Sequence, residues 1–187
     1  MSIKGTRTTS DYLNFDELAM KGIKIIKQGK SPRLGFLVIV GINTGLRISD
    51  ILKLTYEELE QDSITILEGK TGKRRTVRIN VNIHEALVLL KSKTRMTCGM
   101  VFLSKNNTPY SIQYINKWLK LNFKSGKLRC STHSLRKTFA RTIFERSKDQ
   151  MKTLNLLSEI FNHSSPAITR IYLGFRQEEI DDIYLSL

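Results

Sequence analysis

Apolar residues recur at helical spacing over much of the chain, and polar residues or glycines mark where the helices begin and end. Asn14 and Glu17 have the spacing of a capping box, and Gly29 ends the first apolar run. Pro32 favours the first turn of a second helix, which reaches roughly Asn43. The same signals predict helices that start at Ser49, Asn82, Ser111 and Ser165, and three more over residues 135–144, 149–161 and 177–186.

A hairpin is the clearest β signal in the sequence. Ile64 and Ile66 alternate with polar residues, as do Val77 and Ile79, and a basic, glycine-containing turn separates the two runs. Residues 100–103 are predicted to form a short third strand. Helices therefore dominate, and we predict a mainly α fold with a small antiparallel β-sheet (α+β) and no internal boundary.

The charge of the chain narrows the range of partners. Lys and Arg number 31 among the 187 residues and Asp and Glu number 17, so the formal net charge is +14. No Asp or Glu occurs between Glu85 and Glu145. This excess favours a polyanionic partner, which is nucleic acid in the first place and an anionic membrane surface in the second. It argues against an enzyme for cationic substrates.

Cysteine usage and hydropathy favour a reduced, cytoplasmic protein. Cys98 and Cys130 are too few for a disulfide framework, and no Cys/His cluster has the spacing of a zinc site. The N-terminal segment is polar, so we expect no signal peptide. The longest apolar run, residues 36–42, is far shorter than a membrane span. We therefore expect no metal site and no membrane segment.

Four short segments carry the candidate chemistry: TGLRISDIL at 44–52, EGKTGKRR at 68–75, HSLRKTFA at 133–140 and FNHSSPAITRIYLG at 161–174. In this order and at this spacing they resemble the tyrosine recombinase, or phage integrase, family, and the resemblance covers the chain from about residue 14 onward. It implies the fold of that family's catalytic domain. It also implies an enzyme that breaks a DNA strand through a 3′-phosphotyrosyl bond and reseals it, for integration, excision or inversion.

The resemblance also implies a role for individual polar residues in these segments. Tyr172 corresponds to the nucleophile, and His163 corresponds to the histidine nine residues before it. Asp50 stands where the family often has an acidic residue near the first arginine. The residues that correspond to the family's catalytic set are Arg47, Lys70, His133, Arg136, His163 and Tyr172.

Cleavage of a phosphodiester needs these residue types. The transition state carries negative charge on its non-bridging oxygens, which arginine forks bind with paired hydrogen bonds. A tyrosine hydroxyl has a reference pKa of about 10, so it needs a base, and His133 is the candidate. Lys70 is the candidate acid for the departing 5′-oxygen, and His163 is expected to donate to a non-bridging oxygen. The phosphotyrosyl bond keeps the energy of the broken bond, so we expect no cofactor.

Some assignments stay open at the level of sequence. Lys73 lies on the same turn as Lys70 and competes with it for the role of acid. Tyr184 is a second tyrosine near the C-terminus, although no histidine stands nine residues before it. Asp50 either orients the guanidinium of Arg47 or favours a helix N-terminus as a carboxylate.

Two positions depart from the pattern of many family members. Asn162 stands where many have a glycine just before the second histidine, and Lys137 stands where many have a histidine after the second arginine. Neither departure removes a catalytic group, so we expect the site to be active.

The predicted organisation has three parts: an N-terminal extension over 1–13, a catalytic domain over 14–174 and a tail helix over 175–187. Most family members carry an additional N-terminal domain that clamps DNA. We therefore expect either a catalytic-domain fragment or a short single-domain member. The tail helix is expected to dock on a neighbouring subunit, with packing on its own domain as the alternative.

The expected partner is double-stranded DNA, with the protein monomeric in free solution, tetrameric on paired DNA sites and associated with the nucleoid when bound. The predicted DNA contacts are Lys73, Arg74, Arg75, Lys117, Lys120, Lys124, Lys127 and Lys137.

Two other functions are kept as alternatives. One is a type IB topoisomerase, which relaxes supercoils by similar chemistry without partner sites, and the other is a catalytically inactive DNA-binding accessory protein.

Overall fold

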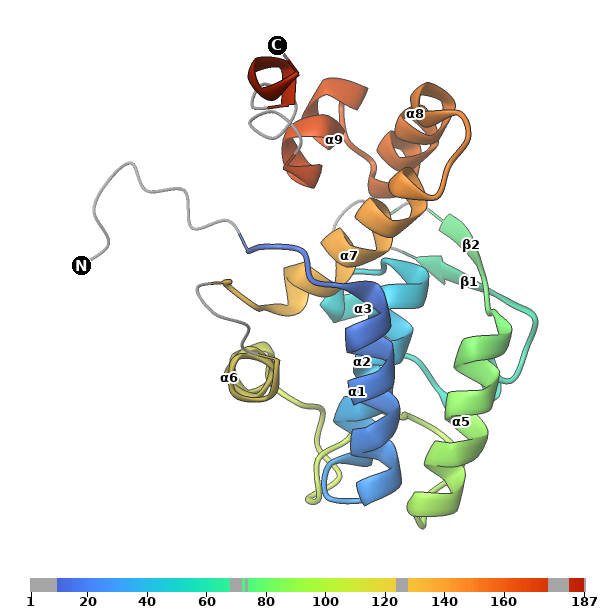
Figure 1. Ribbon diagram of the computed structural model, residues 1–187. Coiled ribbons are helices and arrows are strands. Elements are labelled where there is room, and N and C mark those ends of the chain that lie inside the picture. The colour runs from blue at the N-terminus through green and yellow to red at the C-terminus, as the bar shows by residue number, and fades with distance from the viewer. Residues whose placement is uncertain (1–9, 68–71, 73, 124–127, 175–181, 187) are drawn as a thin grey trace. The chain divides into compact units, whose positions relative to one another are not determined.

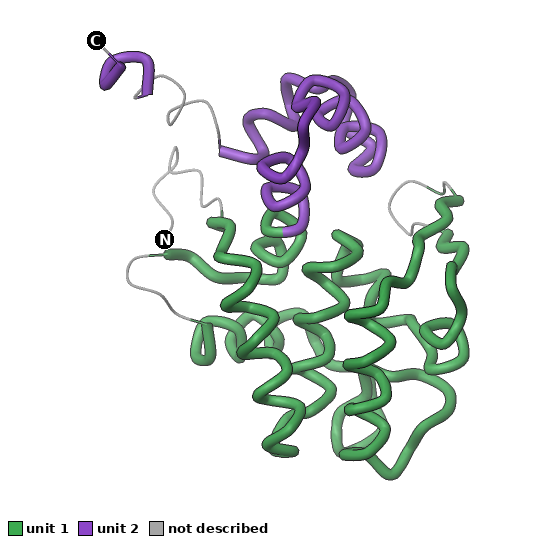
Figure 2. Tube along the Cα trace, turned by 45° about the vertical axis from the view of Figure 1, so that its right-hand side comes forward, with its two compact units in different colours: residues 1–138 green, residues 139–187 purple. Residues whose placement is uncertain are grey.

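Residues 1–138 and 139–187 form two compact units, and the division falls inside one long helix (Figure 2). That helix is α7 (Thr132–Glu145). The computed structural model describes residues 10–67, 72, 74–123, 128–174 and 182–186. The sequence showed no boundary inside residues 14–174, and its composition does not change at the point where the structure divides.

Unit 1 is built around the helix α2, which is buried along most of its length. Figure 1 shows α1, α2 and α5 running beside one another. Gly22 of α1 and Gly35 of α2 allow the closest approach, because a Cβ atom on Gly35 would lie 2.7 Å from the carbonyl oxygen of Gly22. The elements of unit 1, in addition to the first part of α7, are α1 (Phe15–Gln28), α2 (Pro32–Thr44), α3 (Ile48–Ile51), α4 (Tyr56–Leu59), β1 (Ser63–Leu67), β2 (Arg74–Arg78), α5 (Val81–Lys93) and α6 (Ile112–Asn122).

The predicted hairpin is confirmed. Strands β1 and β2 pair antiparallel, with Ile64 opposite Val77 and Ile66 opposite Arg75. Ile64, Ile66 and Val77 are buried, so the alternation in the sequence corresponds to one face on the core. The predicted third strand over residues 100–103 is wrong. Met100 and Leu103 instead form single bridges, the first to Thr55, which caps α4, and the second to Pro109.

Two predicted helix starts are displaced. Asn80, not Asn82, caps α5, because the side chain of Asn80 accepts from the N–H of Ile83 at 3.2 Å. Asn82 instead donates to the side chain of Asn43. Arg47, not Ser49, occupies the N-cap position of α3. The side chains of Asn80 and Asn82 both donate to Asn43, and the predicted capping pair was a match of spacing alone.

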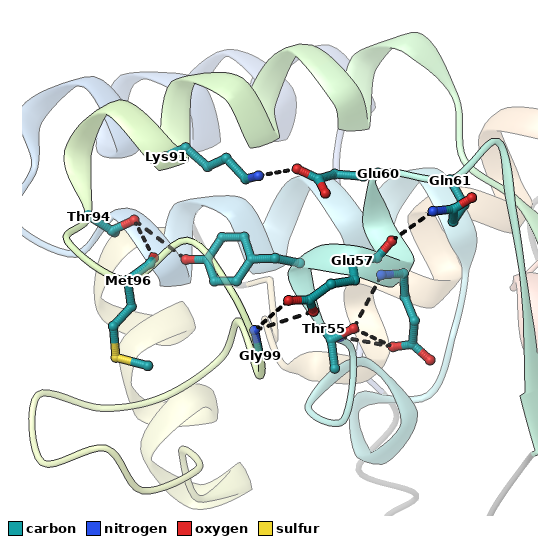
Figure 3. A network of polar contacts seen from close by, with 10 residues as sticks. Thr55, Glu57, Glu60, Gln61, Lys91, Thr94, Met96 and Gly99 are labelled. Carbon is teal, nitrogen blue, oxygen red and sulfur yellow. Dashed lines mark hydrogen bonds and ion pairs between the residues drawn. The ribbon is translucent and has the colours of Figure 1, made fainter.

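A network of polar contacts fastens α4 to the end of α5 and to the following loop (Figure 3). The carboxylate of Glu57 accepts a hydrogen bond from the N–H of Gly99 at 2.9 Å, which holds the pKa of that carboxyl below its usual value. Lys91 pairs with Glu60. The hydroxyl of Thr94 lies within hydrogen-bonding distance of the carbonyl oxygens of Leu90 and Met96, which holds the loop against the end of α5.

The residues just before α1 pack on unit 1. Leu13 is 8% exposed, and its N–H donates to the Oγ1 of Thr138 at 2.9 Å. The Asp11 carboxylate accepts from the N–H of Arg129 at 2.7 Å. The predicted N-terminal extension therefore has a structural part at residues 11–13, whereas residues 1–9 lie outside the described chain.

Unit 2 contains the end of α7, followed by α8 (Gln150–Phe161) and α9 (Pro166–Leu173). Its core holds Phe144, Leu157 and Phe161, with Leu173 from α9. Ile168 is 43% exposed, so α9 does not bury every apolar residue that it carries. Of the predicted tail helix, residues 182–185 are helical, while 175–181 and 187 lie outside the described residues.

The backbone conformation of Asn162 accounts for the departure from the family pattern at this position. It follows α8 with φ 53° and ψ 47°, the left-handed conformation that glycine and asparagine adopt with the least strain.

We expect Asn162→Ala to lower the free energy of unfolding by about 1 kcal/mol, because a Cβ without a local hydrogen-bonding group is disfavoured there. Asn162→Gly should stay within about 0.5 kcal/mol of the wild type. Urea unfolding followed by circular dichroism measures both, and an alanine variant as stable as the glycine variant would contradict the argument.

Candidate active site

The side chains of two arginines meet where α2 ends, and a third arginine follows in the chain. Arg136 of α7 donates a hydrogen bond from Nη1 to the carbonyl oxygen of Gly45. Arg75 of β2 donates from Nη2 to the carbonyl oxygen of Thr44, at 3.3 Å. Arg47 follows two residues after Gly45, at the start of α3. A helix and a strand thus bring two guanidinium groups to the turn that leads into Arg47, within unit 1, and such groups suit the binding of an oxyanion.

Two glycines make this arrangement possible. Gly45 has φ 60°, and its N–H donates to the carbonyl oxygen of Gly41, so the chain leaves α2 in a left-handed conformation that glycine adopts without strain. A Cβ atom on Gly41 would lie 2.8 Å from Cδ1 of Leu135. The start of α7 therefore packs on α2 at a position where a Cβ atom would force Leu135 to shift, and Arg136 is the next residue of α7.

His133 lies in the first turn of α7, three residues before Arg136, so the two side chains share a face of the helix. The N–H of His133 donates to the Oγ of Ser131, and the N–H of Thr132 donates to the Oδ1 of Asn116. These side chains satisfy donors that a helix start leaves open. Because the imidazole is exposed, a base at this position is accessible to a substrate.

Three residues predicted for the site are buried: Asp50, Lys137 and Arg136, of which Arg136 is 6% exposed. Asp50 is 2% exposed, and its Oδ1 accepts from Ser49 at 3.4 Å. It lies three residues after Arg47, and its predicted role of orienting that guanidinium stays a prediction. Lys137 is 7% exposed, and burial lowers the pKa of its ammonium group while the charge of Asp11 acts in the opposite direction. This burial argues against the predicted direct contact between Lys137 and DNA.

Unit 2 carries the second group of predicted residues. The rings of His163 and Tyr172 lie edge to face, with centroids 5.4 Å apart. Phe161 contacts both rings edge-on and is itself 1% exposed, so the pair rests on the core of the unit. His163 and Tyr172 are both half-buried. The nine-residue spacing in the sequence thus corresponds to direct contact between the two side chains.

Thr169 is a site residue that sequence reasoning missed. It is 0% exposed, and its Oγ1 lies 2.9 Å from Nδ1 of His163. It stands three residues before Tyr172, so α9 carries both the tyrosine and the group that fixes the neighbouring imidazole. The only sequence signal was this spacing of three on a predicted helix, which by itself identifies no function.

We expect Thr169→Val to lower the free energy of unfolding by about 1 kcal/mol, because it removes a buried hydrogen bond at nearly constant volume. Strand cleavage should fall roughly tenfold to 100-fold, since the imidazole of His163 loses its fixed orientation. Thr65→Val, on the exposed face of β1, is the matched control and should change neither quantity. Cleavage at the wild-type rate in the Thr169 variant would show that the hydrogen bond is structural only.

The remaining predicted residues divide into two groups. Arg74, Lys117 and Lys120 are exposed, and their contact with DNA stays a prediction. The candidate acid and its rival on the hairpin turn, together with two of the predicted DNA contacts, lie outside the described residues; these are Lys70, Lys73, Lys124 and Lys127.

The described residues contain neither a metal-binding cluster nor a membrane-spanning helix. Among these residues, no group of three or more His, Cys, Asp or Glu side chains could hold a metal ion. No described helix is both long enough and apolar enough to cross a membrane.

The sequence profile of the phage integrase family matches residues 20–179. A probable integrase/recombinase of Bacillus subtilis strain 168, YoeC, is 32% identical over 165 residues, which make up 86% of this chain and 89% of that protein. The tyrosine recombinase XerC of Caldanaerobacter subterraneus is 27% identical over 147 residues, or 73% of this chain and 39% of that protein. This chain therefore spans most of one relative and well under half of the other.

Solved structures of recombinases share the fold. The XerA recombinase matches 97% of this chain and 66% of its own with a TM-score of 0.69 at 21% identity. A lambda integrase dimer bound to a core site matches 92% of this chain and 50% of its own with a TM-score of 0.64 at 17% identity. XerH bound to its difH substrate before cleavage matches with a TM-score of 0.62 at 25% identity, over 94% of this chain and 53% of its own. The predicted fold class is confirmed.

Proposed function

This chain belongs to the phage integrase family, and we propose that it is a site-specific DNA recombinase that cuts and rejoins DNA through a bond between Tyr172 and a 3′-phosphate. XerH, a protein of the same fold, has been captured on DNA before and after cleavage. Each unit supplies one part of this chemistry. Unit 1 carries the arginines at the end of α2, and unit 2 carries the tyrosine beside a histidine.

The observation that carries the proposal is the meeting of Arg136 and Arg75 at the turn that leads into Arg47. A pentacoordinate phosphodiester gathers negative charge on its non-bridging oxygens, and fixed donors aimed at developing charge usually provide the largest part of catalysis. Arginine keeps its charge at every working pH and presents paired donors, so two such groups at a turn that leads into a third arginine suit a phosphodiester better than a neutral substrate.

The proposed reaction assigns one bond change to each group. The Oη of Tyr172 attacks phosphorus and its proton passes to His133, while the bond from phosphorus to the 5′-oxygen breaks. Lys70 gives the departing 5′-oxygen its proton, and His163 donates a hydrogen bond to a non-bridging oxygen. The rejoining step reverses these transfers when a 5′-hydroxyl attacks the phosphotyrosyl bond. The contact between Thr169 and Nδ1 supports the assignment of Nε2 of His163 to the phosphate.

We also propose double-stranded DNA as the partner, with a tetramer on paired sites and a cytoplasmic location. The net charge of +14 supports a phosphate-dominated contact whose affinity falls steeply with salt. Ile183, Tyr184 and Leu185 in the tail are all strongly exposed, which supports docking of the tail on a neighbouring subunit. A chain that ends at Gly174 should bind single sites but fail to assemble on paired sites in native gels.

Covalent trapping tests the proposed function. Supercoiled DNA that carries the sequence flanking the gene is mixed with the protein, denatured in detergent and examined for a protein–DNA adduct. We expect an adduct at one defined position, and strand exchange between two copies of that sequence. Relaxation of supercoils without a defined position would favour a type IB topoisomerase. Normal DNA binding without any adduct would contradict cleavage activity.

A further inference from the structure

A cavity of about 680 Å³ opens in unit 1 at the end where α1 turns into α2. It is lined by the turn over residues 29–33, by Thr94 and Arg95 after α5, and by residues of the 103–114 segment that leads into α6. Arg136 and Arg75 meet at the opposite end of α2, whose 13 residues span about 20 Å. The cavity is therefore separate from the arginines at the other end of α2.

The lining of this cavity is strongly basic. Lys30, Arg33, Arg95 and Lys105 all contribute, and no Asp or Glu is among the described residues that line it. Arg33 is fixed in the wall, because its Nη1 donates to the carbonyl oxygen of Leu103 at 2.9 Å. Its Nε is closed off from solvent and has no hydrogen-bond partner among the described residues. A guanidinium held in place by this hydrogen bond, among further cations, is suited to an anion with several acceptor oxygens.

Two tyrosines add a flat aromatic surface to the same cavity. The rings of Tyr110 and Tyr114 are stacked, with centroids 5.6 Å apart and planes 7° from parallel. Tyr114 is 49% exposed, so part of this stack remains open to a further ring. Burial raises the pKa of Tyr110, which keeps its hydroxyl protonated and able to donate a hydrogen bond at neutral pH. Stacking on such a pair does not select among the bases, because every base has a π-face.

We propose that this cavity binds a nucleotide, with its phosphate on Arg33 and the neighbouring cations and its base against the Tyr110–Tyr114 stack. A volume of this size falls within the range of small-molecule sites and is far too small for a DNA duplex. The nucleotide is either free in solution or an unpaired nucleotide of a DNA strand, since both present the same phosphate and base.

Isothermal titration of the full chain with adenosine 5′-monophosphate, adenosine and inorganic phosphate tests the proposal. We expect the monophosphate to bind at least about tenfold more tightly than either part, because both the phosphate and the base make contacts. Arg33→Gln should weaken this binding about tenfold or more. Lys24→Gln is the matched control, since it removes the same charge from an exposed position on α1 outside the cavity lining, and it should leave binding within about twofold.

Variants of the exposed Tyr114 keep the test meaningful if Arg33→Gln does not fold. Tyr114→Ala should weaken binding of the monophosphate but not of inorganic phosphate, and Tyr114→Phe should bind like the wild type. Equal effects of Arg33→Gln and Lys24→Gln would overturn the proposal, because they would indicate general attraction of an anion to a basic protein. Equal affinities for the monophosphate and inorganic phosphate would also overturn it.

The source of the nucleotide is decided with DNA. Two hairpin duplexes are compared, one blunt and one with a single unpaired 5′-adenylate. Tighter binding of the overhang that is lost in Arg33→Gln assigns the cavity to a strand end, and equal binding of both duplexes, with monophosphate binding intact, assigns it to a free nucleotide. None of these measurements uses strand cleavage, so their outcome is independent of the recombinase proposal.

Discussion

Tyr172→Phe abolishes the covalent protein–DNA adduct and leaves DNA affinity within about twofold of the wild type. The substitution removes one oxygen atom, which is the proposed nucleophile, and keeps the ring. The packing of that ring on Phe161 and His163 is therefore preserved, so the variant should fold with the thermal stability of the wild type. Trapping in detergent measures the adduct, and a gel-shift titration at fixed salt measures affinity.

The second tyrosine near the C-terminus supplies the matched control. Tyr184 is 74% exposed, and Tyr184→Phe should leave the adduct within about twofold of the wild type. An adduct that persists in the Tyr172 variant and disappears in the Tyr184 variant would transfer the role of nucleophile to the tail. This comparison decides between the two tyrosines that the sequence left in competition.

Arg47→Lys lowers the rate of strand cleavage by about 100-fold to 1000-fold, while the affinity for DNA stays within about threefold. Lysine keeps the positive charge but presents a point charge in place of a planar fork, so it cannot hold two phosphate oxygens at once. Arg47 is half-buried and stands at the end of the turn to which Arg136 and Arg75 are hydrogen-bonded. Single-turnover cleavage of a nicked substrate measures the rate directly.

Arg74→Lys is the matched control for the arginine prediction. Arg74 is exposed on β2, one residue from Arg75, so the same substitution there changes neither the charge nor the guanidinium groups at the end of α2. Its cleavage rate should stay within about twofold of the wild type. A rate for Arg47→Lys that is equally close to the wild type would contradict paired phosphate contacts at this position.

The spacing of residues along the chain was enough to predict most of the local structure. The capping interaction of Asn14, the stop at Gly29 and the hairpin were predicted correctly, because each depends on hydrogen bonds or side-chain alternation within a few residues. The resemblance to the family selected the pair His163 and Tyr172, and the structure places their rings in contact.

Other features depended on contacts between distant segments. Asn80 caps α5 although Asn82 has the better sequence pattern, and residues 100–103 lack the partner strand that their apolar character suggested. The burial of Lys137 and of Thr169 depends on what packs over each helix. Periodicity shows that a helix has a buried face, but it does not show which polar residues that face encloses.

The sequence by itself determined the helical character, the hairpin, the basic charge and the order of the motifs, because these depend on residue type and on spacing along one element. Only the tertiary structure decided that Arg136 and Arg75 meet the turn before Arg47, and that Thr169 holds His163. These contacts join residues from different elements, and packing at Gly41 sets how closely α2 and α7 approach. Local propensity carries no information about such distances, because close packing of distant segments fixes them.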